Sequence, residues 1–202
     1  MAPEMKSMPT WVRKALPFAV LGVLVLWLMG AYNGFVSKEV GVEKAWSDIE
    51  TQYQRRADLV PQLVATVQGA ANFEKSTFTA VTEARTAWLN SQSDVNATPE
   101  QQIAAANQFD SALSRLLVSV EAYPELKATA NFQTLQAQLE GTENRIAVAR
   151  KDYNEVTADF NSSIRQIPGS LIAAIFGFDK KPLFEATAGA ETAPVVDFES
   201  EL

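Results

Sequence analysis

The chain has 202 residues, 47% of them hydrophobic and 20% charged, so it is long enough to bury one core and still carry a membrane anchor. Its formal net charge is −7. Three of its 17 basic residues precede position 15, which leaves 14 basic against 23 acidic residues in the remainder. A nucleic-acid-binding surface needs clustered lysine and arginine to neutralise phosphates, so this chain is not expected to bind nucleic acid.

Cysteine and histidine are both absent from the sequence. Without cysteine the chain can form no disulfide, thiolate nucleophile or zinc–thiolate site. Without histidine it lacks the commonest general base and the commonest transition-metal ligand. No phosphate-binding glycine loop and no G-x-S-x-G motif is present either. We therefore expect a protein that is not an enzyme and holds no cofactor or metal; the alternative is an enzyme that uses carboxylates on a bound divalent metal.

One uncharged stretch of 18 residues, ALPFAVLGVLVLWLMGAY, runs from Ala15 through Trp27 to Tyr32. At about 1.5 Å per residue, a helix of this length nearly crosses a hydrocarbon core of about 30 Å. A cleaved signal peptide has a shorter apolar region and a small-x-small cleavage site, which Gly30 to Tyr32 match poorly. The stretch predicts an uncleaved single membrane span, preceded by a short basic segment, 1–14.

The basic residues that flank the span predict its orientation. Lys6, Arg13 and Lys14 precede it, and only Lys38 and Lys44 lie within about 15 residues after it. Basic residues are enriched on the cytoplasmic side, so the N-terminus is expected in the cytoplasm and the rest of the chain outside.

Helical periodicity dominates the chain after the span. A first helix is predicted over 36–89, with a kink at Pro61 and a bend at Gly69 or Asn72 that would divide it in two. Its apolar residues recur in steps of three and four: Trp46, Ile49, Tyr53, Val60, Leu63 and Val67.

Two further long helices are predicted over 99–122 and 129–166. Thr98, Pro99 and Gln101 form a capping box with proline at the first helical position. The second of these helices has apolar residues in near-heptad spacing: Phe132, Leu135, Leu139, Ile146, Tyr153, Val156 and Phe160. Gly141 within it suggests close packing. The predicted fold class is all-α, with an N-terminal transmembrane helix and an antiparallel bundle of three to four long helices spanning 33–185.

A short apolar helix is predicted over 170–177. Its candidate contacts with a membrane or a neighbouring subunit are Leu171, Ile172, Ile175, Phe176 and Phe178. The stretch is too short to cross a bilayer, and closure of the bundle core is the favoured alternative. The acidic tail, 186–202, is predicted to be disordered.

A charged group lies before the proline of the first helix, at Arg55, Arg56 and Asp58. Arg56 falls in phase with the apolar stripe, so its guanidinium is expected to be buried and to need an acceptor. The candidate acceptors are Asp58, Glu143 and Asp152. An ion pair between helices is the favoured interpretation, and a partner-binding arginine is the alternative. The charged residues around position 150 are expected to form a solvated helix face: Glu143, Arg145, Arg150, Lys151 and Asp152.

Four blocks of sequence resemble the LemA family, in the order expected for it. They are AWSDIETQYQRRADLVPQLVATVQG (45–69), AYPELKA (122–128), NFQTLQAQLEGTENRIAVARKDYN (131–154) and IPGSLIAAIFGF (167–178). The resemblance implies a protein of the bacterial envelope with a helical-bundle domain and no assigned catalytic residues, and hence a place in the inner membrane. It also implies a short extracellular N-terminus, which is opposite to the orientation that the flanking charges predict.

The functional hypothesis is a membrane-tethered, non-enzymatic scaffold. Its expected partners are the lipid bilayer, further copies of the chain and other envelope proteins. The alternative is a membrane-shaping or compartment-forming homo-oligomeric assembly.

Overall fold

The computed structural model describes residues 10–69 and 75–185. Every regular element within these ranges is a helix, which confirms the all-α prediction. The helices are α1 (Thr10–Gln68), α2 (Lys75–Ser93), α3 (Pro99–Val120), α4 (Pro124–Lys127), α5 (Ala130–Arg165) and α6 (Gly169–Phe176). The predicted basic segment, 1–14, lies mostly outside the described residues, and the predicted acidic tail, 186–202, lies wholly outside them.

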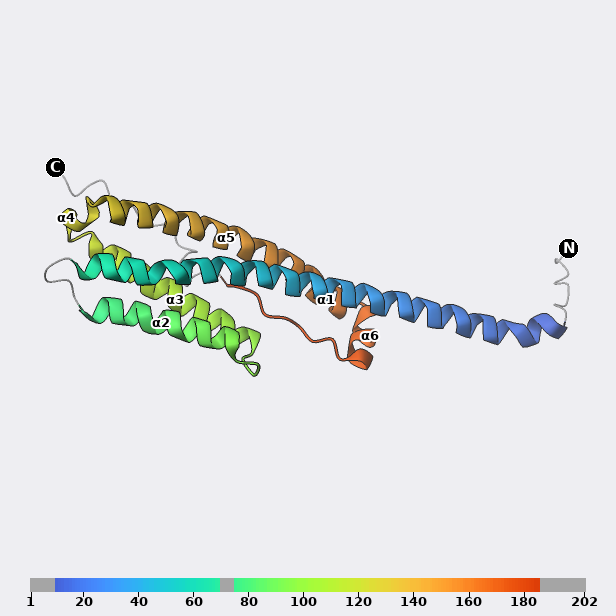
Figure 1. Ribbon diagram of the computed structural model, residues 1–202. Helices are drawn as coiled ribbons and strands as arrows, with labels where there is room; N and C mark the ends of the chain where they lie inside the picture. Colours follow the sequence, from blue (N-terminus) through green and yellow to red (C-terminus); the bar gives the residue numbers. More distant parts are fainter. Residues whose placement is uncertain (1–9, 70–74, 186–202) are drawn as a thin grey trace, which may run out of the picture.

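The four long helices form an antiparallel bundle in two pairs. α1 packs along α5, and α2 packs along α3, with the two pairs laid against each other (Figure 1). The N-terminal part of α1 continues alone beyond the bundle (Figure 1). At the point where α1 leaves the bundle, α6 lies beside it (Figure 1). The bundle therefore has one end from which the apolar part of α1 emerges and a distal end formed by the last turns of α1 with α4.

α1 is a single helix of 59 residues that includes both Pro17 and Pro61. The sequence predicts a span over 15–32 and a separate bundle helix that begins at 36, whereas in the structure one helix runs from the apolar stretch into the bundle without a break. No strong helix breaker separates the two: Asn33 and Gly34 each cost at most about 1 kcal/mol in a helix. The anticipated division of this stretch is confirmed, because α1 ends at Gln68, beside Gly69, and a second helix, α2, begins at Lys75. The predicted end at 89 is four residues short, since α2 continues to Ser93.

The core is built from the apolar stripes that the periodicity indicates. Its largest fully buried apolar side chains come from all four long helices: Ile49, Tyr53 and Leu63 of α1, Trp88 of α2, Phe109 and Leu116 of α3, and Ile146 and Phe160 of α5. Tyr53, Phe132, Tyr153 and Phe160 are core residues, as their spacing indicates. Burying aromatic side chains of this size supplies much of the hydrophobic stabilisation of such a bundle.

Local signals fix where the helices begin and turn. The capping box at Thr98 forms as predicted, with its hydroxyl accepting from the Gln101 backbone N–H. Gly177 ends α6 with a φ of 76°, a left-handed conformation that favours glycine. Gly141 lies in open surroundings, so the expectation of close packing there is wrong. Gly169 is the glycine that close packing requires, since a Cβ there would lie 2.2 Å from the Ser163 carbonyl oxygen.

Candidate functional site

A charged network around one buried arginine joins three helices at the middle of the bundle. Arg56 of α1 is 1% exposed, and its guanidinium pairs with Asp110 of α3 at 2.5 Å and with Glu143 of α5. The same Asp110 carboxylate accepts a hydrogen bond from Arg150 of α5 at 2.6 Å and from the Tyr53 hydroxyl at 2.7 Å. Asp110 is therefore the shared acceptor on which two arginines and a tyrosine converge.

The charges and protonation states in the network are those of a structural ion-pair cluster. Two guanidinium groups face two carboxylates, so its formal charges cancel. Burial raises the pKa of the Tyr53 hydroxyl, and the negative charge of Asp110 raises it further. A hydroxyl held in its protonated form is a hydrogen-bond donor and a poor base or nucleophile. The arrangement is suited to holding helices in register.

The structure places the predicted charged residues in three different settings. Of the three candidate acceptors for Arg56, only Glu143 contacts it. Asp58 instead accepts from Gln54 one turn earlier at 2.9 Å, and both Arg55 and Asp152 are exposed. The acceptors Asp58 and Asp152 fail because their side chains point to solvent from faces of α1 and α5 that do not meet Arg56.

Two members of the network are not predicted from the sequence. Asp110 falls in phase with Ile103, Ala106 and Leu113, which are buried, so a carboxylate within the apolar stripe is the signal that identifies it. Arg150 is placed on a solvated face by its local sequence. That expectation is wrong, because Arg150 crosses to Tyr53 and Asp110 and stacks on the Phe184 ring at 4.6 Å.

A segment without regular secondary structure, 178–185, follows α6 and packs along α5. The Asn161 side chain pairs in both directions with the backbone of Lys181, and Asn154 does the same with Phe184, each at 2.8–2.9 Å. The Phe184 ring is buried and stacks on Trp46 of α1. The segment is therefore held against α1 and α5 by side-chain contacts.

The residues predicted to contact a membrane or subunit fall into two groups, one buried and one exposed. Ile172 is 2% exposed and packs into the core, and Phe178 is half-buried against Phe35 and Phe160. Leu171 and Ile175 are 65% and 72% exposed, and Phe176 is 49% exposed. One face of α6 thus closes the bundle, while the other leaves Leu171 and Ile175 largely exposed and Phe176 half exposed.

The predicted span residues lie on the free part of α1. The helix is long and apolar enough to cross a membrane, and none of its most apolar 18-residue window is buried. Ala15 and Trp27 are exposed there, and Tyr32 contacts α6 through Phe176 at a ring separation of 4.8 Å. The apolar stretch therefore ends where the bundle begins.

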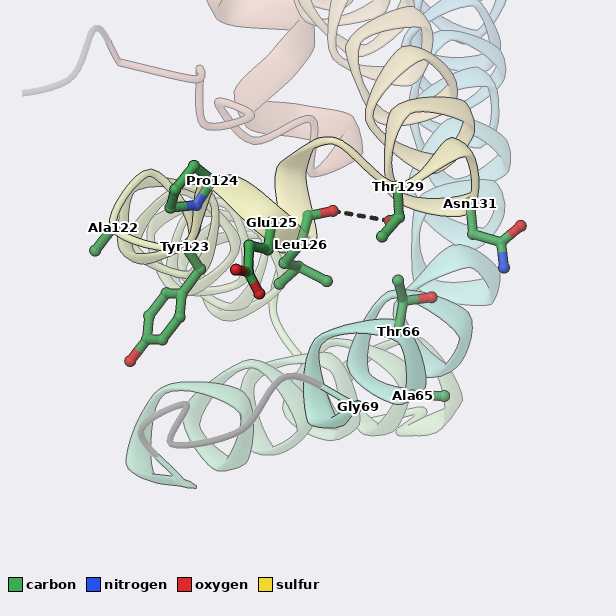
Figure 2. Close-up of a pocket in the computed structure, with 10 residues that line it drawn as sticks. All are labelled: Ala65, Thr66, Gly69, Ala122, Tyr123, Pro124, Glu125, Leu126, Thr129 and Asn131. Carbon is green, nitrogen blue, oxygen red and sulfur yellow. Dashed lines mark hydrogen bonds between the residues drawn. The ribbon is translucent and has the colours of Figure 1, made fainter.

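The distal end of the bundle carries an open pocket of about 810 Å³ (Figure 2). The end of α1 supplies Ala65, Thr66 and Gly69, and the connection from α3 through α4 to α5 supplies the rest, which are Ala122, Tyr123, Pro124, Glu125, Leu126, Thr129 and Asn131. The Thr129 hydroxyl donates to the Leu126 carbonyl at 2.8 Å, which fixes this connection (Figure 2). Glu125 is the single charged residue in the lining. The pocket is suited to binding and offers no pair of groups for acid–base chemistry.

Comparison with known proteins decides the family. The family model described as "LemA family" matches residues 45–198, more than half of the chain. The chain belongs to the LemA family. This match includes the Arg56 network, the distal pocket and α6, and the resemblance in the sequence is thereby confirmed.

Individual relatives match over almost the whole chain. Magnetosome protein MamQ 1 and MamQ 2 of Paramagnetospirillum magneticum are each 26% identical, over 92% of this chain and 76% of their own length. Protein LemA of Metamycoplasma hominis is 25% identical, over 90% of this chain and 83% of its own. None of these relatives is named as an enzyme. Within the described residues, no group of three acidic side chains is arranged to hold a metal ion.

Proposed function

We propose that this LemA-family protein is a membrane-tethered, non-enzymatic scaffold that binds other envelope proteins through the distal end of its bundle. The observation that carries the proposal is the continuity of α1 from the apolar stretch to the distal pocket. At about 1.5 Å per residue, the part of α1 after Tyr32 is about 54 Å long. The scaffold would hold its pocket at a fixed height above the bilayer.

Three features support a structural function. The network around Arg56 ties α1, α3 and α5 together by charge-assisted hydrogen bonds, which favours a rigid body. The pocket lining carries backbone, hydroxyl and apolar groups with one carboxylate, a composition suited to a protein segment. Relatives that are named as magnetosome proteins also favour a component of a cellular structure over a catalyst.

Site-specific photocrosslinking in intact membranes tests this function. A photoreactive phenylalanine analogue replaces Asn131 in the distal pocket, and in a matched control it replaces Thr86 on an exposed face of α2. We expect an adduct with another envelope protein from position 131 and none from position 86. A full-length protein that stays a monodisperse monomer in nanodiscs and yields no adduct at position 131 would contradict the scaffold.

Self-association is the second candidate function, and a stripe on α1 favours it. Gly30, Gly34, Ser37 and Gly41 follow one another at spacings of four, three and four residues, so they share one helix face. No other part of the described chain approaches a Cβ built at any of the three glycines within 4 Å. Small residues at this spacing let helices pack closely; here Gly30 lies within the apolar stretch and the other three follow it, so the contact would form where the span leaves the bilayer.

The oligomer candidate is tested by mass in nanodiscs. Gly34→Leu is expected to convert an oligomer into a monomer, whereas Val25→Leu, on another face of α1, is expected to leave the mass unchanged. Equal masses for the wild-type protein and for Gly34→Leu would rule out this stripe as the contact.

The proposed location is the bacterial inner membrane, with the bundle on the extracytoplasmic side. It is supported by the excess of basic residues before the span. A reporter fused after Leu202 that is active only in the cytoplasm should stay inactive. An active reporter would place the bundle in the cytoplasm, the arrangement implied by an extracellular N-terminus.

A further inference from the structure

The exposed face of α6 is apolar although it faces away from the bundle core. Ile167, just before the helix, is 85% exposed, and it is followed at four-residue steps by Leu171 and Ile175. Phe176 adds a partly exposed ring beside them. Large apolar side chains thus gather on one short stretch of chain, while Ile172 and Ala173 hold the opposite face in the core.

Aromatic contacts fix α6 at the level where the apolar stretch of α1 ends. Tyr32 is the last residue of that stretch, and its ring lies 4.8 Å from Phe176 and 5.7 Å from Phe178. Phe178 also packs edge-on against Phe35, one turn further along α1. Gly169 lets the first turn of α6 approach α5 and Phe35 more closely than any side chain would allow. The height of α6 relative to α1 is therefore set by packing.

We infer that α6 lies in the headgroup region of the bilayer, with Leu171, Ile175 and Phe176 inserted among the first carbons of the acyl chains beside the span. This inference rests on the membrane tether of the proposed function. Tyrosine and tryptophan are enriched at the boundary between headgroups and hydrocarbon, and Tyr32 would mark that boundary here. A short helix with an apolar face at this height is then in contact with lipid.

The charges around α6 fit a lipid surface. Arg165, at the end of α5, and Lys180, just after α6, are both exposed and line one pocket of about 480 Å³. Asp179 beside Lys180 is exposed as well, so two basic residues outweigh one acidic residue here. Basic residues that flank an inserted apolar helix attract anionic headgroups. A second copy of the chain is the less suitable occupant, because a stable protein interface buries about 800 Å² on each partner, far more than this short face offers.

Nitroxide labelling of the full-length protein tests the inference directly. The sequence contains no cysteine, so single-cysteine variants carry one label each without further changes. Leu171→Cys and Ile175→Cys report on α6, Leu24→Cys reports on the span, and Val148→Cys on an exposed face of α5 is the matched bundle control. All four positions are exposed in the wild-type structure, so the substitutions leave the core intact.

Collision rates with oxygen, which concentrates in lipid, and with a water-soluble nickel chelate are measured in nanodiscs of phosphatidylcholine and phosphatidylglycerol. At positions 171 and 175 the ratio of oxygen to nickel collisions is expected to be severalfold higher than at position 148 and lower than at position 24. Those values would place α6 in the interface and the span in the core of the bilayer.

The other results overturn the inference in distinguishable ways. Nickel access at position 175 equal to that at position 148, with position 24 still shielded, would place α6 in water and leave the tether standing. Shielding of positions 171 and 175 from both reagents would indicate a protein partner in place of lipid. Nickel access at position 24 would refute the membrane span, and with it the tether on which the inference depends.

Discussion

The charged network predicts an asymmetry between the two carboxylates that pair with Arg56. Asp110 is 21% exposed and accepts from Arg56, Arg150 and Tyr53, whereas Glu143 is 62% exposed and pairs with Arg56 alone. Asp110→Ala leaves the 1% exposed Arg56 with one solvent-facing partner, and it removes the acceptor of Tyr53. Removing one partner of a buried ion pair costs about 3–5 kcal/mol.

Glu143→Ala is the matched control, because it breaks an ion pair with the same arginine. An exposed carboxylate gains little from such a pair, so the cost is about 0–1 kcal/mol. For a chain of this length, 1 kcal/mol shifts the midpoint of thermal unfolding by about 2–4 °C. Asp110→Ala is therefore expected to lower the midpoint by about 6–20 °C, and Glu143→Ala by no more than about 4 °C.

The assay is thermal unfolding of the full-length protein in mild detergent, followed by near-ultraviolet circular dichroism. This signal reports on the bundle because Trp88 is buried against Tyr53 at a ring separation of 4.7 Å, beside the network. Asp110→Asn, which keeps one acceptor oxygen, should fall between the two alanine variants. Equal shifts for Asp110→Ala and Glu143→Ala, or a larger one for Glu143→Ala, would refute Asp110 as the shared acceptor.

Three further predictions concern single positions. Gly169→Ala is expected to lower the unfolding free energy by about 1–3 kcal/mol through the clash with α5, whereas Gly141→Ala, in open surroundings, is expected to raise it by up to about 1 kcal/mol. Tyr53 has a raised pKa in the folded protein, so its protonated hydroxyl contributes its full share of the unfolding free energy below pH 10, and that share falls as the pH rises towards the folded pKa. Tyr53→Phe is expected to flatten this fall in unfolding curves measured between pH 9 and about 12. Asn161→Ala is expected to free the backbone of Lys181, and so to speed proteolysis between α6 and position 185.

Each of these has a result that would contradict it. Equal unfolding curves for Gly169→Ala and Gly141→Ala would show that a side chain at position 169 causes no clash with α5. An alkaline profile of Tyr53→Phe that matches the wild type would mean that this hydroxyl does not control stability above pH 10. Ser162→Ala, at the exposed neighbouring position, is the control for the proteolysis experiment. Cleavage of Asn161→Ala no faster than that of Ser162→Ala would show that the side-chain amide does not hold the segment.

Patterns with a fixed period could be predicted from the sequence. The capping box at Thr98 and the near-heptad spacing from Phe132 to Phe160 depend on local sequence, and their helices, α3 and α5, form within two residues of the expected bounds. The apolar stretch that ends at Tyr32 is helical as expected, but it is only part of α1. Arg56 is predicted to be buried by the same logic, since a charge in phase with an apolar stripe has no path to solvent. Asp110 satisfies that criterion equally, so a charge within the stripe of α3 is a usable signal as well.

Features that depend on tertiary contacts could not be predicted in this way. Arg150 belongs to a charged run on α5, and only the approach of α1 and α3 brings Tyr53 and Asp110 within its reach. The segment that carries Phe184 has no period, so its docking on Asn154 leaves no local signal. The continuity of α1 is not predicted because a change from apolar to polar composition suggests a boundary, although neither Asn33 nor Gly34 costs enough free energy to end a helix.

The unbroken backbone of α1 means that the membrane segment and the bundle share one helical phase. Adding one residue to an α-helix turns everything beyond it by about 100° and moves it by about 1.5 Å. An insertion between Phe35 and Val42 would therefore swing the core stripe of α1 away from α5 while Tyr32 kept its hold on α6. Across this stretch, evolution can exchange residues but cannot readily add or remove them, so its length is constrained more tightly than its composition.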